Sequence, residues 1–269
     1  MVDSGRIPHA IMLAGPAGVP KLALARAFAQ YLHCKNPQNG EPCGVCPDCR
    51  QTITMNQADT RYSYPIFKSG SSATPPTSEA YAEEWSEYVR TNKVENYRQW
   101  QGIIRSENKV LTIYVTESDR IIHFMTTGAY SSKYKVVIIW LPERMNESTA
   151  NKLLKIIEEP TKNAIFVLVC DNPQEVIGTI RSRTQIIEMK RPDFESIAQY
   201  LIEKYNVDHN EAKTIATAAD GDILRAEEAL TIDSEQSEFF AKFAEVMRLA
   251  YVADLKPLYD WAEEINSFK

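Results

Sequence analysis

Short apolar runs alternate with helical patterns along much of the chain. Residues 10–14, 164–170 and, after Lys135, the rest of 135–141 are apolar at successive positions, which is typical of strands buried on both faces in a parallel sheet. After the first run, apolar residues recur at three- and four-residue spacing, which predicts an amphipathic helix. The predicted inward positions of this helix are Leu22, Ala25, Phe28, Ala29 and Leu32.

A second amphipathic helix is predicted between the last two runs. It begins at Asn146, turns Leu153, Leu154 and Ile157 inward, and ends at Pro160. Strands that alternate with helices indicate an α/β domain with a parallel sheet flanked by helices. We expect this domain to cover residues 1–190.

The pattern becomes entirely helical after this domain. Residues 191–232 predict a small helical domain, and residues 233–269 predict the start of a further helical region. Apolar residues form one stripe of that last region, and such a stripe requires a partner surface. The stripe comprises Phe239, Phe240, Phe243, Val246 and Met247.

The segment from about residue 55 to about residue 110 interrupts the α/β pattern. Residues 69–78 are rich in turn formers and predict a mobile excursion. Residues 79–101 are charged, contain tyrosines and predict a helix. We interpret the whole segment as an inserted surface element.

Composition limits the class of protein. The chain has 269 residues, of which 44% are hydrophobic and 25% charged, as in an ordinary soluble protein of about two domains. Its 30 basic and 36 acidic residues leave a net charge of -6, which disfavours independent binding to nucleic acid. The sequence contains neither a long apolar run nor an N-terminal apolar signal core. We therefore expect a cytoplasmic protein without a membrane partner.

The segment between the first strand and its helix is similar to a phosphate loop, G-x-x-x-x-G-K-[ST]. Gly15 and Lys21 match the first glycine and the lysine, and Gly18 lies within the loop. Pro20 replaces the second glycine and Leu22 replaces the hydroxyl residue. Proline has no amide hydrogen for a phosphate, and leucine has no oxygen for magnesium.

The acidic residue that positions magnesium is also missing. It is expected at the end of a later strand, but Trp140, Leu141 and Pro142 stand there and Glu143 is the first acid. We therefore expect that ATP and magnesium are not bound productively. Two alternatives remain open: a plain strand-to-helix turn, or a divergent ATPase that still uses Lys21 and Glu143.

Four of the five cysteines lie close together, separated by eight, two and two residues: Cys34, Cys43, Cys46 and Cys49. Four thiolates with no open position predict structural zinc. The alternative is a group of reduced cysteines or a redox pair. His33 is a less suitable ligand because all four thiols are available, and Cys170 is predicted to be a core residue.

Three stretches, together with the cysteine spacing, carry a family resemblance. Residues 5–10, 149–160 and 180–184 are similar to the AAA+ module of the bacterial DNA polymerase III clamp loaders. The resemblance covers residues 5 to about 230 apart from the insertion. It implies a P-loop-type α/β domain with a zinc knuckle at residues 34–49, a helical lid domain, and the truncated start of a C-terminal helical collar.

Within that family, an intact framework with a broken nucleotide loop resembles the subunit that does not hydrolyse ATP. The partners so implied are the motor subunits and the delta subunit, with the sliding clamp and primed DNA reached through the assembly. Ser182, Arg183 and Thr184 resemble the family's Ser-Arg-Cys motif, with threonine in place of cysteine. This implies that Arg183 is an arginine finger directed at the ATP of a neighbouring subunit.

These residues also allow other interpretations. Without the resemblance, Arg183 is a surface arginine that pairs with acids such as Glu188. Arg225 stands where the family has a second sensor arginine, and beside a broken loop we expect it to be structural. The pair at residues 158–159 is expected to have a structural role at a helix end, and a zinc-ribbon nucleic-acid module is disfavoured because Lys35 and Arg50 lie among acids.

Overall fold

The computed structural model describes residues 6–68, 75–92, 94–106 and 109–230, with five single positions beyond them. The chain divides into two compact units between Pro192 and Asp193. The turn-rich residues 69–74 lie outside the described part, as does most of the helical region expected at residues 233–269. Among the described residues, no helix is long and apolar enough to cross a membrane.

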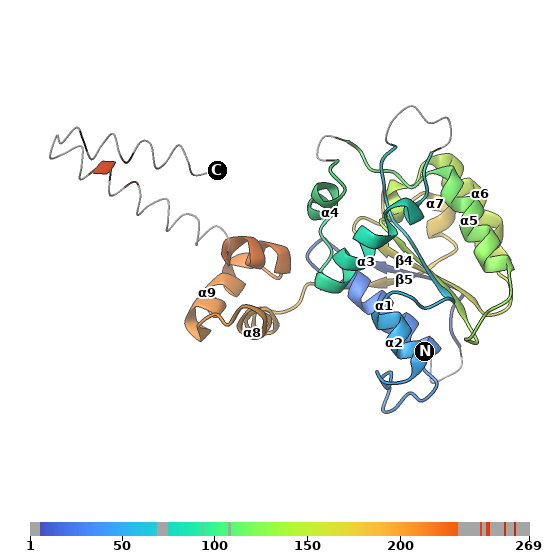
Figure 1. The fold of residues 1–269 in the computed structure, drawn as a ribbon, viewed down its shortest axis with the longest axis horizontal. Helices are drawn as coiled ribbons and strands as arrows, with labels where there is room; N and C mark the ends of the chain where they lie inside the picture. The colour runs from blue at the N-terminus through green and yellow to red at the C-terminus, as the bar shows by residue number, and fades with distance from the viewer. Residues whose placement is uncertain are drawn as a thin grey trace. The chain divides into compact units, whose positions relative to one another are not determined.

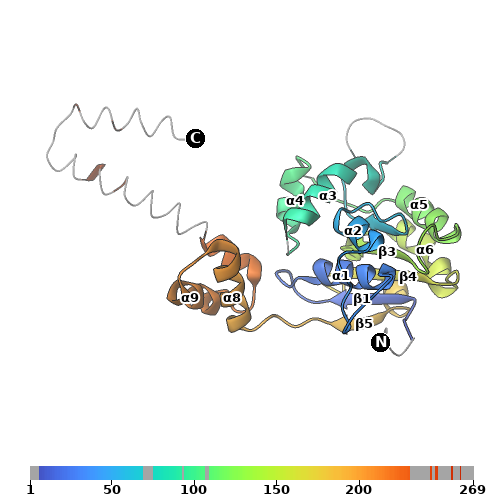
Figure 2. The same cartoon turned by 60° about the horizontal axis from the view of Figure 1, so that its bottom comes forward.

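A five-stranded parallel sheet forms the centre of the first unit (Figures 1 and 2), with strand order β2-β3-β4-β1-β5. The strands are β1 (Ala10–Ala14), β2 (Thr60–Ser63), β3 (Lys135–Trp140), β4 (Ala164–Cys170) and β5 (Gln185–Glu188). The predicted parallel sheet flanked by helices is confirmed. Every residue of β1, β3 and β4 is buried, because helices cover both faces.

The predicted limits of the central strands agree closely with the structure. Strands β1 and β4 have the predicted bounds, while β3 ends one residue early because Leu141 has a left-handed φ of 56°. Strands β2 and β5 were not predicted. Both are short edge strands with polar residues, and β2 lies inside the segment that we interpreted as an insertion.

Seven α-helices of the first unit are described: α1 (Lys21–His33), α2 (Pro47–Ile53), α3 (Ala82–Thr91), α4 (Tyr97–Ile103), α5 (Val115–Thr126), α6 (Glu147–Glu158) and α7 (Gly178–Arg181). Two 3-10 turns, η1 (Ser78–Tyr81) and η2 (Pro142–Arg144), accompany them. Ile11 and Leu13 of β1 face a core shared with α1, α3 and α4. Ala10 and Met12 face the opposite core, which α5, α6 and α7 cover.

The two predicted amphipathic helices are confirmed. Helix α1 buries Leu22, Ala25, Ala29 and Leu32, while Phe28 is only half-buried. In α6 the Asn146 side chain accepts a hydrogen bond from the Thr149 amide at 2.8 Å and so caps the first turn. Leu153 and Ile157 are buried as expected, but Ile156 is buried where Leu154 was predicted.

The interpretation of the insertion as a surface element is wrong. Its helices α3 and α4 carry Trp85, Tyr88 and Trp100, each no more than 2% exposed. Trp85 stacks on Tyr64 with ring centroids 4.0 Å apart and packs against Trp140 of β3 at 5.2 Å. The charged residues of α3 are exposed, while its residues Trp85 and Tyr88 face the sheet.

The second unit is a small helical domain. Its first two helices are α8 (Phe194–Tyr205) and α9 (His209–Ala219), and residues 223–230 are also helical. Asp193 caps α8 by accepting from the Ser196 amide at 2.7 Å. Ile197, Leu201, Ala212 and Ala216 are buried within this unit.

The aromatic cluster predicts a large effect on stability. We expect Trp85→Ala to lower the free energy of unfolding by about 3–5 kcal/mol, because truncation of a buried tryptophan leaves a cavity. Chemical unfolding followed by far-ultraviolet circular dichroism measures the change. Tyr130→Ala is the control, since Tyr130 is 87% exposed, and its effect should lie within about 0.5 kcal/mol. Equal effects of the two substitutions would contradict the packing described here.

Candidate functional site

Lys21, the lysine of the phosphate-loop motif, is the first residue of α1 and is completely buried. Its Nζ donates a hydrogen bond to the Pro16 carbonyl oxygen at 2.7 Å. The same nitrogen forms an ion pair with Asp171 Oδ1 at 2.9 Å and with Glu95 Oε1 at 3.7 Å. The positive charge of Lys21 is therefore already neutralised within the chain.

Glu95 lies between α3 and α4, far from the loop in sequence. Its carboxylate accepts a hydrogen bond from the Leu22 amide, with oxygen–nitrogen distances of 3.2 and 3.3 Å. The residue is 5% exposed. Burial raises the pKa of Glu95 to about 7, although the Lys21 ammonium acts in the opposite direction. Glu95 was not predicted as a site residue, because nothing in its neighbourhood along the chain connects it to the phosphate loop.

Gly15 and Gly18 of the loop each stand at a position where the backbone favours glycine. A Cβ at Gly15 would lie 2.4 Å from the Met189 carbonyl oxygen, so the start of the loop must approach the chain after β5 closely. Gly18 has a φ of 85°, which favours glycine. The structure thus places Gly15, Gly18 and Lys21 in one connection between β1 and α1, with Pro20 as the residue before the helix.

The Glu143 side chain binds the backbone just after β4. Its Oε1 accepts hydrogen bonds from the backbone amides of Asp171 at 2.8 Å and Asn172 at 3.3 Å, just after β4. Its Oε2 is buried and has no hydrogen-bond partner among the described residues. Burial raises the pKa of Glu143. This carboxyl group serves as an acceptor for the backbone after β4.

The surroundings of Lys21 are acidic. Its ammonium group contacts Glu95 and Asp171, and Glu143 binds the backbone amide of Asp171. An incoming phosphate would have to compete with these carboxylates for one lysine, and like charges at close range repel. The arrangement engages the lysine within its own chain.

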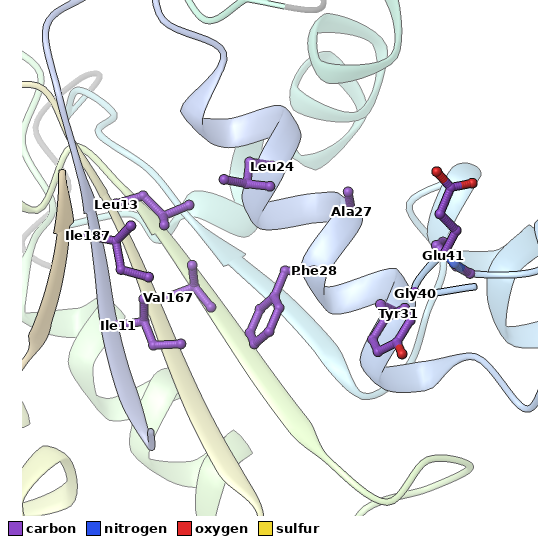
Figure 3. A pocket seen from close by; sticks show the side chains of 11 residues that line it. Ile11, Leu13, Leu24, Ala27, Phe28, Tyr31, Gly40, Glu41, Val167 and Ile187 are labelled. Atoms are coloured by element: carbon purple, nitrogen blue, oxygen red, sulfur yellow. The ribbon is translucent and has the colours of Figure 1, made fainter. Parts of the chain in front are cut away.

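A cavity beside α1 is apolar and separate from this group. It has a volume of about 600 Å³ and lies between α1 and strands β1, β4 and β5 (Figure 3). The Phe28 side chain and the exposed Leu24 border it, together with Ile187 of β5. Its lining does not contain Lys21, Glu95 or Asp171.

The four clustered cysteines come together in space. The Sγ atoms of Cys34, Cys43, Cys46 and Cys49 all lie within 4.8 Å of one another. Tetrahedral zinc, with zinc–sulfur bonds of about 2.3 Å, requires sulfur atoms about 3.8 Å apart. Backbone amides of Cys43 and Cys46 donate to the sulfur atoms of Cys34 and Cys43 at 3.2 and 3.4 Å. The cluster therefore fits a metal ion such as zinc.

His33 is engaged elsewhere. Its Nδ1 and Nε2 lie 2.5 and 2.7 Å from the hydroxyl groups of Ser132 and Thr60. Nearby, Asp59 accepts three backbone hydrogen bonds at 2.7 to 2.8 Å, from Tyr130, Ser131 and Ser132. Burial acts to raise the pKa of Asp59, but these bonds outweigh it and the pKa is lowered. The polar contacts attach the cysteine segment to the loop before β3.

Arg183 lies at the surface, in the turn between α7 and β5. Its Nε and Nη2 bind Glu158 at the end of α6, and its Nη1 donates to the Thr179 carbonyl oxygen at 2.9 Å. The side chain is 35% exposed. Arg183 therefore pairs with a surface acid, as the alternative interpretation expected, although this acid is Glu158 and not Glu188. Arg225 lies in the other unit, with its Nε 3.8 Å from Asp222.

Residues 1–193 match the protein family described as "DNA polymerase III, delta subunit". The chain belongs to this family. The predicted resemblance to the polymerase III clamp-loader proteins is thereby confirmed.

Individual relatives agree with this assignment. The chain is 25% identical to the DNA polymerase III subunit delta' of Haemophilus influenzae over 260 residues, which covers 96% of this chain and 66% of that protein. It is 24% identical to the subunit tau of Bacillus subtilis over 272 residues, which covers 93% of this chain and 40% of that protein. The chain thus spans less than two thirds of the length of these relatives.

Solved structures also resemble the chain. A DNA polymerase III gamma subunit-related protein of Thermotoga maritima has a TM-score of 0.40 and 15% identity, covering 96% of this chain and 73% of that one. The RuvB Holliday junction branch migration motor of the same organism has a TM-score of 0.45 and 13% identity, covering 83% of this chain and 53% of that one.

The cysteine cluster predicts a stoichiometric metal. We expect the purified chain to contain about one zinc ion, and Cys46→Ser to lose it, because one of four thiolate ligands is removed. Metal analysis by atomic emission measures the content. Cys170→Ala is the control, because Cys170 lies in β4 and is no member of the cluster. A Cys46→Ser protein that retains zinc at the original affinity would contradict the assignment.

Proposed function

We propose that the chain is a non-hydrolysing subunit of a DNA polymerase III clamp loader, similar to delta'. In this role it is a rigid stator within an AAA+ ring and supplies Arg183 in trans to a neighbouring ATPase subunit while the sliding clamp is loaded. The observation that carries the proposal is the contrast between two cations. Lys21 is buried and neutralised within the chain, whereas Arg183 lies at the surface.

The first part of the proposal is that this chain does not hydrolyse ATP. Leu22 has no oxygen for magnesium, and its amide already donates to Glu95. The Glu143 carboxylate binds the backbone after β4. Trp140 stands at the end of β3, where an acid would position magnesium, and it packs in the aromatic cluster. The elements of a productive ATP and magnesium site are thus absent or engaged among the described residues.

The second part concerns Arg183. A guanidinium group supplied in trans stabilises the charge on a transferring phosphoryl group and raises the rate by about 10³–10⁵. In this chain its ion pair with Glu158 lies at the surface, and such pairs contribute only about 0–1 kcal/mol. The ion pair keeps the Arg183 side chain ordered, and it is weak enough for the guanidinium group to leave Glu158 and contact a phosphate bound by the next subunit.

The remaining parts of the chain have supporting roles in this proposal. The metal in the cysteine cluster is structural zinc, because four thiolates leave no open position for a substrate. Residues 1–190 form the AAA+ domain, residues 191–232 the lid and residues 233–269 the start of the collar. The partners are the motor subunits and the delta subunit, with the clamp and primed DNA contacted through the cytoplasmic assembly.

A divergent clamp-loader ATPase is the second candidate. It is favoured by the position of Lys21 at the start of the helix after β1. The same structure disfavours it, since both carboxylates that contact Lys21 come from the chain itself.

The two candidates differ in ATP turnover. We expect the isolated chain to show no magnesium-dependent turnover and weak or absent binding of a fluorescent ATP analogue, because Lys21 is occupied. A coupled phosphate-release assay measures turnover. The matched control is a motor subunit under the same conditions. A rate comparable with that control would overturn the proposal.

Arg183→Ala tests the contribution in trans. In the complete assembly with clamp and primed DNA, we expect ATP turnover at the adjacent site to fall by about 10³-fold or more, because the transition-state charge is left unbalanced. Single-turnover measurement separates that site from the others. The total steady-state turnover of the assembly should fall only by the fraction that this one ATPase site contributes.

Two further variants serve as controls for Arg183→Ala. Arg90→Ala removes another exposed arginine, from α3, and should leave turnover unchanged. Glu158→Gln releases Arg183 within its own chain and should retain turnover. A loss in Glu158→Gln as large as in Arg183→Ala would show that the pair maintains local structure, and an unchanged rate in Arg183→Ala would contradict the finger.

A further inference from the structure

The beginning of α1 attracts anions in this chain. Backbone amides in the first turn of a helix lack partners within the helix, and they favour negative charge together with the helix dipole. In α1 the Leu22 amide donates to the Glu95 carboxylate, and the buried Lys21 ammonium lies 3.7 Å from the same group. An amide of the first helical turn and the motif lysine thus bind one carboxylate from a distant part of the same chain.

We propose that Glu95 is a built-in ligand of the phosphate loop, which occupies the position of a phosphate group and excludes nucleotides. The inference rests on the proposed function, in which this subunit does not hydrolyse ATP, and it names the group that closes the site. The site is then filled by its own chain, and the motif changes at Pro20 and Leu22 are only part of the reason for inactivity.

The space around Glu95 supports exclusion. The side chain is 2% exposed. The cavity that remains beside it, between α1 and the end of α3, has a volume of about 10 Å³, which is about the space of one water molecule. A phosphate group therefore cannot reach the Leu22 amide unless Glu95 moves away.

The segment that carries Glu95 is held firmly. The Asn96 amide donates to the Tyr88 hydroxyl at 2.6 Å, and this hydroxyl donates to the Asn96 carbonyl oxygen at 3.1 Å. The Asn96 side chain accepts from the Arg98 amide at 2.9 Å and caps α4. Arg26 of α1 donates to the Val89 carbonyl oxygen at 2.9 Å. These bonds fix both sides of Glu95 relative to α1.

The electrostatic surroundings of Glu95 are consistent with a position that the fold imposes on its side chain. Burial disfavours the charged form of Glu95 and raises its pKa to about 7, and nearby Asp171 acts in the same direction, while Lys21 and the Leu22 amide oppose them. A free glutamate side chain would remain in water under these conditions. The aromatic packing of α3 and α4 on the sheet places the carboxylate there instead.

Glu95→Ala tests the inference by opening the site. The probe is a fluorescent ADP analogue without magnesium, with inorganic tripolyphosphate as competitor. In the wild type, only molecules whose site is open can bind the analogue, so its apparent affinity is reduced by that fraction. Removal of the Glu95 carboxylate should therefore tighten binding by about tenfold or more. Combination with Lys21→Ala should abolish the gain, because the loop lysine is then missing. Fluorescence anisotropy measures binding, and circular dichroism confirms folding.

Glu84→Ala is the matched control, since Glu84 lies on the exposed face of α3 and its removal should leave binding as in the wild type. If Glu95→Ala does not fold, Glu95→Ser replaces it with the same expectation. A folded variant that binds no better than the wild type would overturn the inference, as would tight binding by the wild type without turnover. Neither result would contradict the stator function, which fails only if the wild type hydrolyses ATP or Arg183→Ala has no effect in the assembly.

Discussion

The buried charge of Lys21 is the constraint that determines how the first unit is arranged around the phosphate loop. An ammonium group removed from water requires compensating partners, since an isolated buried charge is very costly. Asp171, at the end of β4, supplies one partner at 2.9 Å, and Glu95 supplies a second. This requirement joins three parts of the chain that are distant in sequence: the first helix, the fourth strand and the segment between α3 and α4.

The aromatic cluster explains how the third of these parts reaches the lysine. Trp140 ends β3 where a hydrolysing enzyme would need an acid, and its ring packs against Trp85 and Tyr88 of α3. Trp140 thus provides an apolar base for α3 and α4. Through this packing, the end of β3 is connected to the position of Glu95.

The cysteine cluster and Arg183 lie outside this group, and each depends on its own local interactions. The Asp48 carboxylate accepts a hydrogen bond from the Ser131 hydroxyl at 3.2 Å, and His33 contacts the Ser132 hydroxyl, so the cysteine segment is attached to the loop before β3. Arg183 is ordered by Glu158 at the end of α6. In the proposed function, Arg183 at the surface acts on the neighbouring subunit.

The sequence by itself determined the features that depend on neighbours along the chain. The uninterrupted apolar runs predicted β1, β3 and β4, because a strand buried on both faces has no polar side. The spacing of the four cysteines predicted a compact cluster, since the turns between them are short. Pro20 and Leu22 also predict a defective phosphate loop from side-chain chemistry alone, and this stays a prediction.

Only the tertiary structure decided the features that depend on contacts between distant segments. Edge strands β2 and β5 carry polar residues and give no periodic signal. The helices around Trp85 are amphipathic, but their burial follows from a partner surface that Trp140 and Tyr64 provide. Glu95 and Lys21 are brought together by the same packing. A pairing across such a separation leaves no local pattern, because its energy is determined by burial and distance in the folded chain.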